Sequence, residues 1–175
     1  EIGGGFGTSV HILIENYKNI RKILYLDIAP TLYVGTQYLK SFYGDAVIDY
    51  KSLKDLNSIK FSANNDLEIF CITPWQIELF KSSIDIFMNS HSFVEIPDFI
   101  VQNYVDKFNE FPGSKHSAIA LNTYDGYDKK TIHPDELPKF FKNRKFEYFE
   151  ENKLLDSPTQ HKNLYYISAG KFSLQ

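Results

Sequence analysis

The first residues of the chain carry alternate glycines led by an acid. Glu1 is followed by glycines at positions 3, 5 and 7, which gives Glu-x-Gly-x-Gly-x-Gly with a further glycine at position 4. Glycine lets the backbone turn sharply and lets a ligand approach without a Cβ clash. A helix that begins directly after such a turn offers free amide donors and the positive end of its dipole. The pattern therefore predicts a ligand-binding turn, with these candidate residues: Glu1, Gly3, Gly4, Gly5 and Gly7.

A second acid lies at the distance expected for a nucleoside-binding site. Asp27 ends the apolar run 23–26 and comes twenty residues after Gly7. A carboxylate at that place accepts hydrogen bonds from both hydroxyls of a ribose. The dinucleotide pattern Gly-x-Gly-x-x-Gly is not met, because Thr8 or Val10 stands at its last position, and no Walker Gly-Lys-Ser/Thr follows. An acid ahead of the glycines also opposes a phosphate and suits a cationic ligand.

Strands and helices alternate along the chain and would place these residues at one edge of a sheet. This order favours an α/β fold, a Rossmann-like three-layer sandwich whose sheet is mainly parallel. The last two strands are separated by a polar loop, and we expect them to form an antiparallel hairpin. Strands are predicted at 23–26, 67–72, 84–88, 117–122, 145–150 and 163–169, and helices at 9–17, 31–42, 77–80, 97–110 and 134–141.

Length and composition limit the classes of function. The 175 residues predict a single domain, residues 1–175, and the net charge of -3 gives no reason to expect a nucleic-acid partner. The single Cys71 excludes a disulfide framework and fits a reducing compartment, so we expect a cytoplasmic protein. No stretch approaches 18 apolar residues, which argues against membrane insertion. Oligomeric state is left open.

The glycine pattern resembles the first motif of class I S-adenosylmethionine-dependent methyltransferases at each of its four positions. A second block narrows this resemblance. The segment 89–97 reads Asn-Ser-His-Ser-Phe-Val-Glu-Ile-Pro and, with 26–30 and 71–76, is similar to the bacterial sugar O-methyltransferase family. That family carries an Asn followed closely by Ser-Phe-x-Glu-Met-Pro, and Ile96 stands where Met is usual. The likeness covers about residues 1–125.

This resemblance implies an O-methyltransferase that uses S-adenosylmethionine as its cofactor and acts on a hydroxyl of a sugar or glycan precursor. It places the segment around Pro74 and Trp75 near the adenine, and Asn89 and Ser90 near the methionine moiety. For Trp75, packing in the core is an equally good interpretation. The cofactor-binding residues implied in addition to the glycine turn are Asp27, Ile28, Pro74, Trp75, Asn89 and Ser90.

A sugar hydroxyl is a poor nucleophile at neutral pH, so methyl transfer to it benefits from a general base. His91 and Glu95 follow one predicted strand, and Tyr124 and Asp125 follow the next, so all four qualify by position. We prefer His91, because the ordinary pKa of histidine is near neutrality. The alternative is that His91 only packs or hydrogen-bonds locally.

Glu95 matches the glutamate of the family and is predicted to orient the base or bind a sugar hydroxyl. Its alternative role is to cap the helix that opens at Pro97. No spacing motif supports a metal site, so we predict no metal.

Two other functions stay open. A non-catalytic binding module would keep the fold without turnover, and a nicotinamide-dependent oxidoreductase would need the third glycine that the turn lacks.

Glu1 should be the last residue of a first, central strand, yet the apolar residues of that strand do not precede it. We therefore expect an N-terminally truncated domain with its first strand largely missing.

Overall fold

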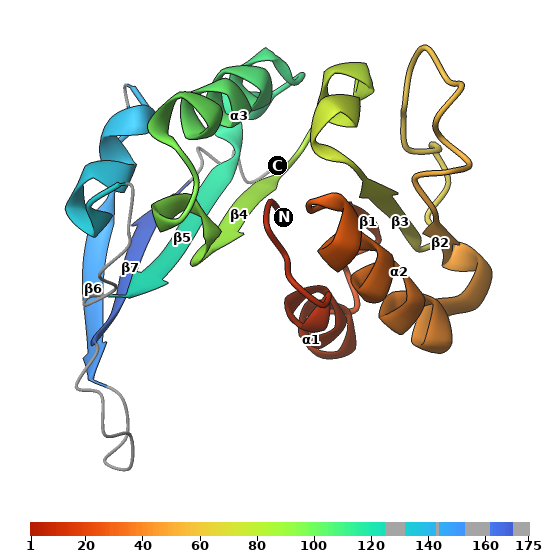
Figure 1. The fold of residues 1–175 in the computed structure, drawn as a ribbon, viewed down its shortest axis with the longest axis horizontal. Helices are drawn as coiled ribbons and strands as arrows, with labels where there is room; N and C mark the ends of the chain where they lie inside the picture. The colour runs from red at the N-terminus through yellow and green to blue at the C-terminus, as the bar shows by residue number, and fades with distance from the viewer. Residues whose placement is uncertain (125–131, 143, 153–161, 170–175) are drawn as a thin grey trace. The chain divides into compact units, whose positions relative to one another are not determined.

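The computed structural model describes residues 1–124, 132–142, 144–152 and 162–169 (Figure 1). The chain divides into two compact units, Glu1–Ser82 and Ser83–Gln175, and each contains one sheet. Helices and strands alternate through both units, which confirms the predicted α/β fold. Within the described ranges, no helix combines the length and the apolar character that crossing a membrane requires.

The first unit, Glu1–Ser82, is built on a three-stranded parallel sheet with the strand order β1-β3-β2. The predicted strands and helices are present, and β2 is an addition, because two residues are too short to show a pattern in the sequence. The elements in chain order are α1 (Thr8–Asn16), β1 (Lys22–Leu26), α2 (Ala29–Tyr43), a 3-10 helix (Gly44–Ala46), β2 (Val47–Ile48), β3 (Glu68–Ile72) and a second 3-10 helix (Pro74–Leu79).

Both helices of this unit bury part of their apolar residues in the core of the unit. Pro30 lies in the first turn of α2, where its missing N–H costs nothing, and Gly44 ends the helix with a positive φ of 52°. Ile2 forms an isolated parallel bridge with Leu26, so the chain runs along β1 just before the glycines. The buried core joins Val10, Ile14, Tyr25, Leu32, Leu39, Val47, Ile69 and Cys71.

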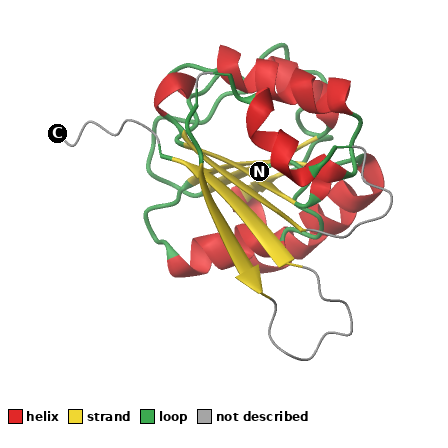
Figure 2. Ribbon diagram, turned by 90° about the vertical axis from the view of Figure 1, so that its left-hand side faces the viewer, coloured by secondary structure: helices red, strands yellow, loops and turns green. Residues whose placement is uncertain are grey.

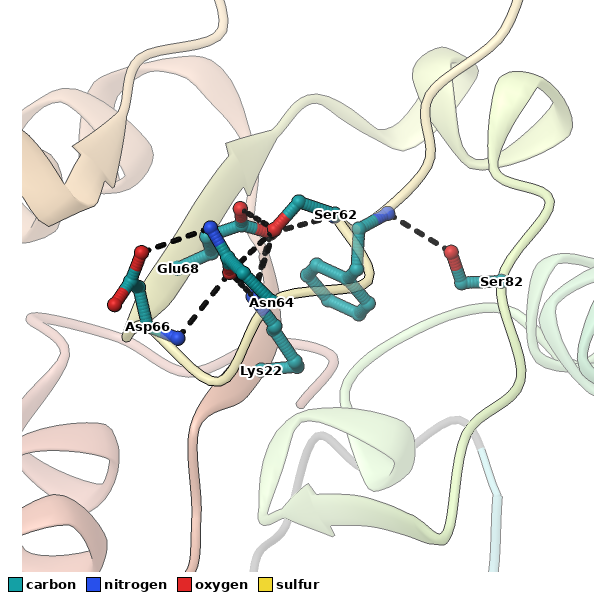
Figure 3. A network of polar contacts seen from close by, with 7 residues as sticks. Lys22, Ser62, Asn64, Asp66, Glu68 and Ser82 are labelled. Atoms are coloured by element: carbon teal, nitrogen blue, oxygen red, sulfur yellow. Dashed lines mark hydrogen bonds and ion pairs between the residues drawn. The ribbon is translucent and has the colours of Figure 1, made fainter.

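A network of polar side chains lies at the amino-terminal end of the same sheet (Figure 3). Lys22 and Glu68 are the first residues of β1 and β3 and pair in register. The Lys22 ammonium lies 3.2 Å from the Glu68 carboxylate and donates to Ser62 Oγ at 3.1 Å and Asn64 Oδ1 at 2.9 Å. Burial alone would raise the pKa of Glu68, but hydrogen bonds from Ser62 and Lys22 hold it below its ordinary value. The network ties the segment before β3 to β1.

The second unit, Ser83–Gln175, contains a four-stranded sheet with the strand order β4-β5-β7-β6. β4 and β5 are parallel, and β7 pairs antiparallel with both β5 and β6 (Figure 2), which confirms the predicted antiparallel C-terminal pair. The described elements are β4 (Ile86–Ser90), a 3-10 helix (Ser92–Val94), α3 (Asp98–Glu110), a 3-10 helix (Ser114–His116), β5 (Ala118–Tyr124), a 3-10 helix (Pro134–Phe140), β6 (Glu147–Asn152) and β7 (Lys162–Ser168).

Aromatic rings fill the core of this unit. Phe87 of β4 lies against Phe108 of α3 and against Phe141, with ring centroids 4.7 and 5.4 Å apart. The helix α3 buries Val101, Tyr104, Val105 and Phe108, the spacing of one helix face. Many of the aromatic residues thus serve packing.

Candidate functional site

The glycine turn, residues 3–7, joins Ile2 to α1. The Gly3 amide donates to Leu26 O at 2.8 Å, and the Gly7 amide donates to Gly4 O at 3.0 Å. Gly3, Gly5 and Gly7 have φ values of 70°, 60° and 81°, a left-handed conformation that costs an L-residue about 1–2 kcal/mol. The alternate glycines of the motif are therefore the ones whose backbone requires glycine. Gly7 directly precedes α1 as its N-cap residue.

Asp27 holds this turn from the end of β1. Its Oδ2 accepts a hydrogen bond from the Gly5 amide at 2.8 Å, and its Oδ1 accepts one from the Ile28 amide at 2.7 Å. Burial raises the pKa of Asp27, although the two amide donors oppose the shift. A carboxylate has about four acceptor positions, so each oxygen can accept a further donor. Asp27 can thus accept hydrogen bonds from the turn and still accept two more from ligand hydroxyl groups.

Glu1 contributes a second buried acid at the start of the turn. In the part of the chain that the structure describes, neither carboxylate oxygen of Glu1 has a hydrogen-bond partner although both are buried. Burial raises the pKa of Glu1. A buried carboxylate without a donor is costly, and a cationic ligand group would satisfy it. The donor set therefore fits a ligand that carries a positive charge and vicinal hydroxyls.

The end of β3 lies at the same edge of the sheet, called here the carboxyl edge. Leu26 pairs with Ile72 in parallel register, so both strands end together. The 3-10 helix that follows begins at Pro74 and leaves Trp75 69% exposed, while Ile28 is 61% exposed. The alternative that Trp75 packs in the core is wrong. The carboxyl edge instead offers apolar side chains that a flat ring can cover.

In the second unit, Asn89 is used to shape the turn after β4. Its side chain is buried, donates to Ser92 Oγ at 2.6 Å and accepts from the Phe93 amide at 3.2 Å. These bonds fold the 3-10 helix Ser92–Val94 against the strand end. A direct contact of Asn89 with a cofactor stays a prediction.

His91 follows β4 in a strained conformation. Among the described residues it is the only one besides glycines with a positive φ, 68°. Such strain persists where the surroundings over-determine it, and it is concentrated at functional sites. The His91 amide donates to Asn122 O at 2.7 Å, and its Nδ1 lies 3.1 Å from Ser90 Oγ. His91 thus combines a strained backbone with an imidazole that lies beside Ser90.

Asn122 of β5 completes this polar group and was not predicted as a site residue. Its Nδ2 donates to Ser90 Oγ at 3.3 Å, and Ser90 and Asn122 pair in parallel register. Within the described ranges, Asn122 Oδ1 and Thr123 Oγ1 are buried without a hydrogen-bond partner. The available signal was that Asn122 ends the predicted strand 117–122, next to the strand that precedes His91.

The remaining candidates, Glu95, Tyr124 and Asp125, are not part of these two hydrogen-bonded groups. Glu95 is exposed, and its backbone amide donates to Ser92 O at 3.0 Å. α3 begins after Pro97 with no side-chain cap, so the capping role for Glu95 is wrong. Tyr124 is the last residue of β5, and Asp125 lies outside the described residues. The described part of the chain contains no cluster of three or more His, Cys, Asp or Glu side chains suited to a metal ion.

Comparison with solved structures identifies the fold. The plantazolicin methyltransferase BamL, solved with SAH, is 11% identical, with a TM-score of 0.54 over 97% of this chain and 76% of BamL. The PH0226 protein from Pyrococcus horikoshii OT3 is 9% identical, with a TM-score of 0.53 over 96% and 81% of the two chains. The chain has a Rossmann-like α/β fold, which it shares with these proteins. No protein-family model and no curated protein sequence matches the chain.

The structure thus brings the predicted residues together in two groups. The first unit gathers the glycine turn, Asp27 and Ile28 around shared hydrogen bonds, and it places Pro74 and Trp75 at the same carboxyl edge. The second unit gathers Ser90 and His91 with Asn122. That both groups serve one reaction stays a prediction.

Proposed function

We propose that this protein is an S-adenosylmethionine-dependent O-methyltransferase that acts on a hydroxyl of a sugar or glycan precursor. The observation that carries the proposal is the Gly5–Asp27 hydrogen bond at the carboxyl edge, beside the unpartnered buried carboxylate of Glu1. Ligands of open α/β sheets bind at this edge. The fold that the chain shares with the methyltransferase BamL, which was solved with SAH, supports S-adenosylmethionine as the ligand.

The residues of the first unit suit the parts of this cofactor. Asp27 would accept both ribose hydroxyls, and Glu1 would face the cationic methionine end. The exposed Trp75 and Ile28 would cover the adenine ring. When bound, S-adenosylmethionine supplies an activated methyl group on a sulfonium.

The residues of the second unit suit removal of a proton from the acceptor. Ser90 Oγ accepts a hydrogen bond from Asn122 and lies 3.1 Å from His91 Nδ1, so His91 belongs to a polar group at the end of β4. The ordinary pKa of histidine is near neutrality, which suits a side chain that takes up a proton. His91 is therefore our proposed general base. Asn89 and Ser90 are kept as proposed contacts of the methionine moiety, and Glu95 as a proposed contact of the acceptor.

The sugar acceptor is proposed from the segment 89–97, whose pattern resembles the sugar O-methyltransferase family. The exposed position of Glu95 in this segment leaves its carboxylate available to a hydroxyl group.

Cofactor binding is tested by isothermal titration of the chain with S-adenosylmethionine, with SAH and with NADH. We expect heat from the first two and none from NADH. Asp27→Ala removes two ribose hydrogen bonds, each worth about 0.5–1.5 kcal/mol, and should weaken binding by roughly tenfold or more. Absence of heat with both adenosyl ligands, or unchanged affinity of Asp27→Ala, would overturn the assignment.

Catalysis is tested by transfer of a labelled methyl group to a panel of sugars and sugar nucleotides. We expect His91→Ala to lower kcat by about 10²–10⁴-fold while cofactor affinity is unchanged. His116→Ala changes an exposed histidine of the same unit and is the matched control. Tight cofactor binding without transfer to any hydroxyl would favour the non-catalytic module.

A further inference from the structure

Tyr25 lies directly beneath the glycine turn. It is fully buried in β1, and its hydroxyl donates a hydrogen bond to the carbonyl oxygen of Gly5. The amide of the same Gly5 donates to Asp27 Oδ2 at 2.8 Å. Residues two apart in an extended chain point to the same side, so Tyr25 and Asp27 reach the turn together. Gly5 is therefore held at both its N–H and its C=O by one strand end.

The Tyr25 ring also explains two glycines that backbone geometry does not. Gly4 and Gly35 both lack a positive φ. A Cβ on Gly4 would lie 2.6 Å from Tyr25 Cε2, and a Cβ on Gly35 of α2 would lie 2.8 Å from Tyr25 Cζ and 3.1 Å from Gly5 O. Real Cβ atoms do not come so close to a ring carbon. The turn and α2 thus leave a slot for the ring.

We propose that Tyr25 is a positioning residue for cofactor binding, which sets the height and orientation of the Gly5 peptide groups through its hydroxyl. The inference rests on the proposed function, and it adds Tyr25 and Gly35 to the residues that build the site. Tyr25 itself does not touch the cofactor. It acts by fixing the backbone that Asp27 grips.

The Tyr25 hydroxyl can donate this hydrogen bond throughout the working pH range. Burial raises the pKa of Tyr25 far above its ordinary value, so the group stays a neutral donor at any working pH. Without it, the Gly5 carbonyl would lose its side-chain donor, and the turn would be anchored on one side only.

The central test is Tyr25→Phe, which removes the hydroxyl and keeps the ring in its slot. We expect affinity for S-adenosylmethionine to fall by about 2- to 12-fold, the equivalent of one hydrogen bond. Tyr43→Phe is the matched control, because it removes a hydroxyl of α2 that bonds to Glu15 of α1, away from the turn. Its affinity should equal that of the wild type.

Amide hydrogen exchange separates positioning from a general loss of stability. In Tyr25→Phe, exchange should accelerate at Gly5 and Gly7, while the β3 amides of Ile69 and Cys71 keep their protection. Equal acceleration at all four sites, or an affinity unchanged from the wild type, would overturn the proposal. If the wild-type chain fails to bind S-adenosylmethionine, the proposed function falls, yet the exchange result still decides whether Tyr25 positions the turn.

A second variant tests the slot. Gly35→Ala should displace the Tyr25 ring and break its bond to Gly5, so Tyr25→Phe should cost little further affinity in the Gly35→Ala background. Fully additive losses would contradict a shared mechanism. Should Gly35→Ala not fold, Tyr25→Phe and Tyr43→Phe decide alone.

Discussion

At the scale of single residues, the favoured protonation state of Asp27 and Glu1 at the carboxyl edge differs between the ligand-free and the ligand-bound protein. Burial disfavours the charged form of Asp27 and of Glu1, and so raises the pKa of both. A cationic, hydroxyl-bearing ligand instead requires both to be charged. Ligand binding and ligand-free stability should therefore respond to pH in opposite directions.

We expect affinity for S-adenosylmethionine to fall as the pH drops through the raised pKa of Asp27, at a pH above the ordinary value of about 3.9. Over the same range, the free energy of unfolding of the ligand-free wild type, relative to Asp27→Asn, should rise as the pH drops, because protonation removes a buried charge. Titration calorimetry and urea denaturation across pH measure the two slopes. Slopes of the same sign would contradict this account.

At the scale of elements, the glycine turn and the end of α2 allow a matched comparison. Gly5 and Gly44 have φ values of 60° and 52°, and a Cβ on either would meet no atom within 4 Å. Only backbone strain therefore separates glycine from alanine at these positions. The two sites differ in their place: Gly5 contacts Asp27, and Gly44 ends α2.

Gly5→Ala and Gly44→Ala should each lower the free energy of unfolding by about 1–3 kcal/mol, since each forces an L-residue into a conformation suited to glycine. Only Gly5→Ala should also weaken binding of S-adenosylmethionine. Chemical denaturation and titration of both variants provide the measurements. Weakened binding in Gly44→Ala would mean that stability, and not the turn, limits affinity.

The Lys22 network acts at the opposite end of the same sheet. Lys22→Met leaves the Glu68 carboxylate, whose side chain is 17% exposed, without its cation, and it removes two further hydrogen bonds. We expect the free energy of unfolding to fall by about 1–3 kcal/mol. Lys18→Met removes the exposed pair with Glu15 and should change it by less than about 0.5 kcal/mol. If Lys22→Met and Lys18→Met lower the free energy of unfolding equally in urea denaturation, the Lys22 network does not contribute to stability.

At the scale of the whole molecule, ligand binding should appear as stabilisation. At a concentration of 100 times Kd, a ligand that binds only the folded state adds about 2.7 kcal/mol. For a chain of this size, S-adenosylmethionine should then raise Tm by roughly 5–10 °C. NADH should leave Tm unchanged, and Asp27→Ala should lose about half of the shift or more at the same concentration of S-adenosylmethionine. A rise with NADH alone would revive the oxidoreductase alternative.

Much of the fold could be predicted because its signals are local. The apolar runs at 23–26 and 67–72, the helix-opening Pro30 and the helix-ending Gly44 each act within a few residues. The short strand Val47–Ile48 was not predicted, since its two residues owe their pairing to β3. The range 97–110 predicts α3, but which residues the helix buries follows from contacts such as Phe108 with Phe87, while Phe99 of the same helix is 70% exposed.

The sequence by itself determined the positions at which chemistry can occur. The alternate glycines are required by their own positive φ values, and Asp27 follows a strand whose apolar pattern is visible in the chain. Only the tertiary structure decided which groups meet these residues. Tyr25 reaches Gly5 across twenty positions, Gly35 makes room for its ring, and Asn122 reaches Ser90 from a neighbouring strand. Such contacts depend on strand register and on side-chain packing, which no local pattern encodes.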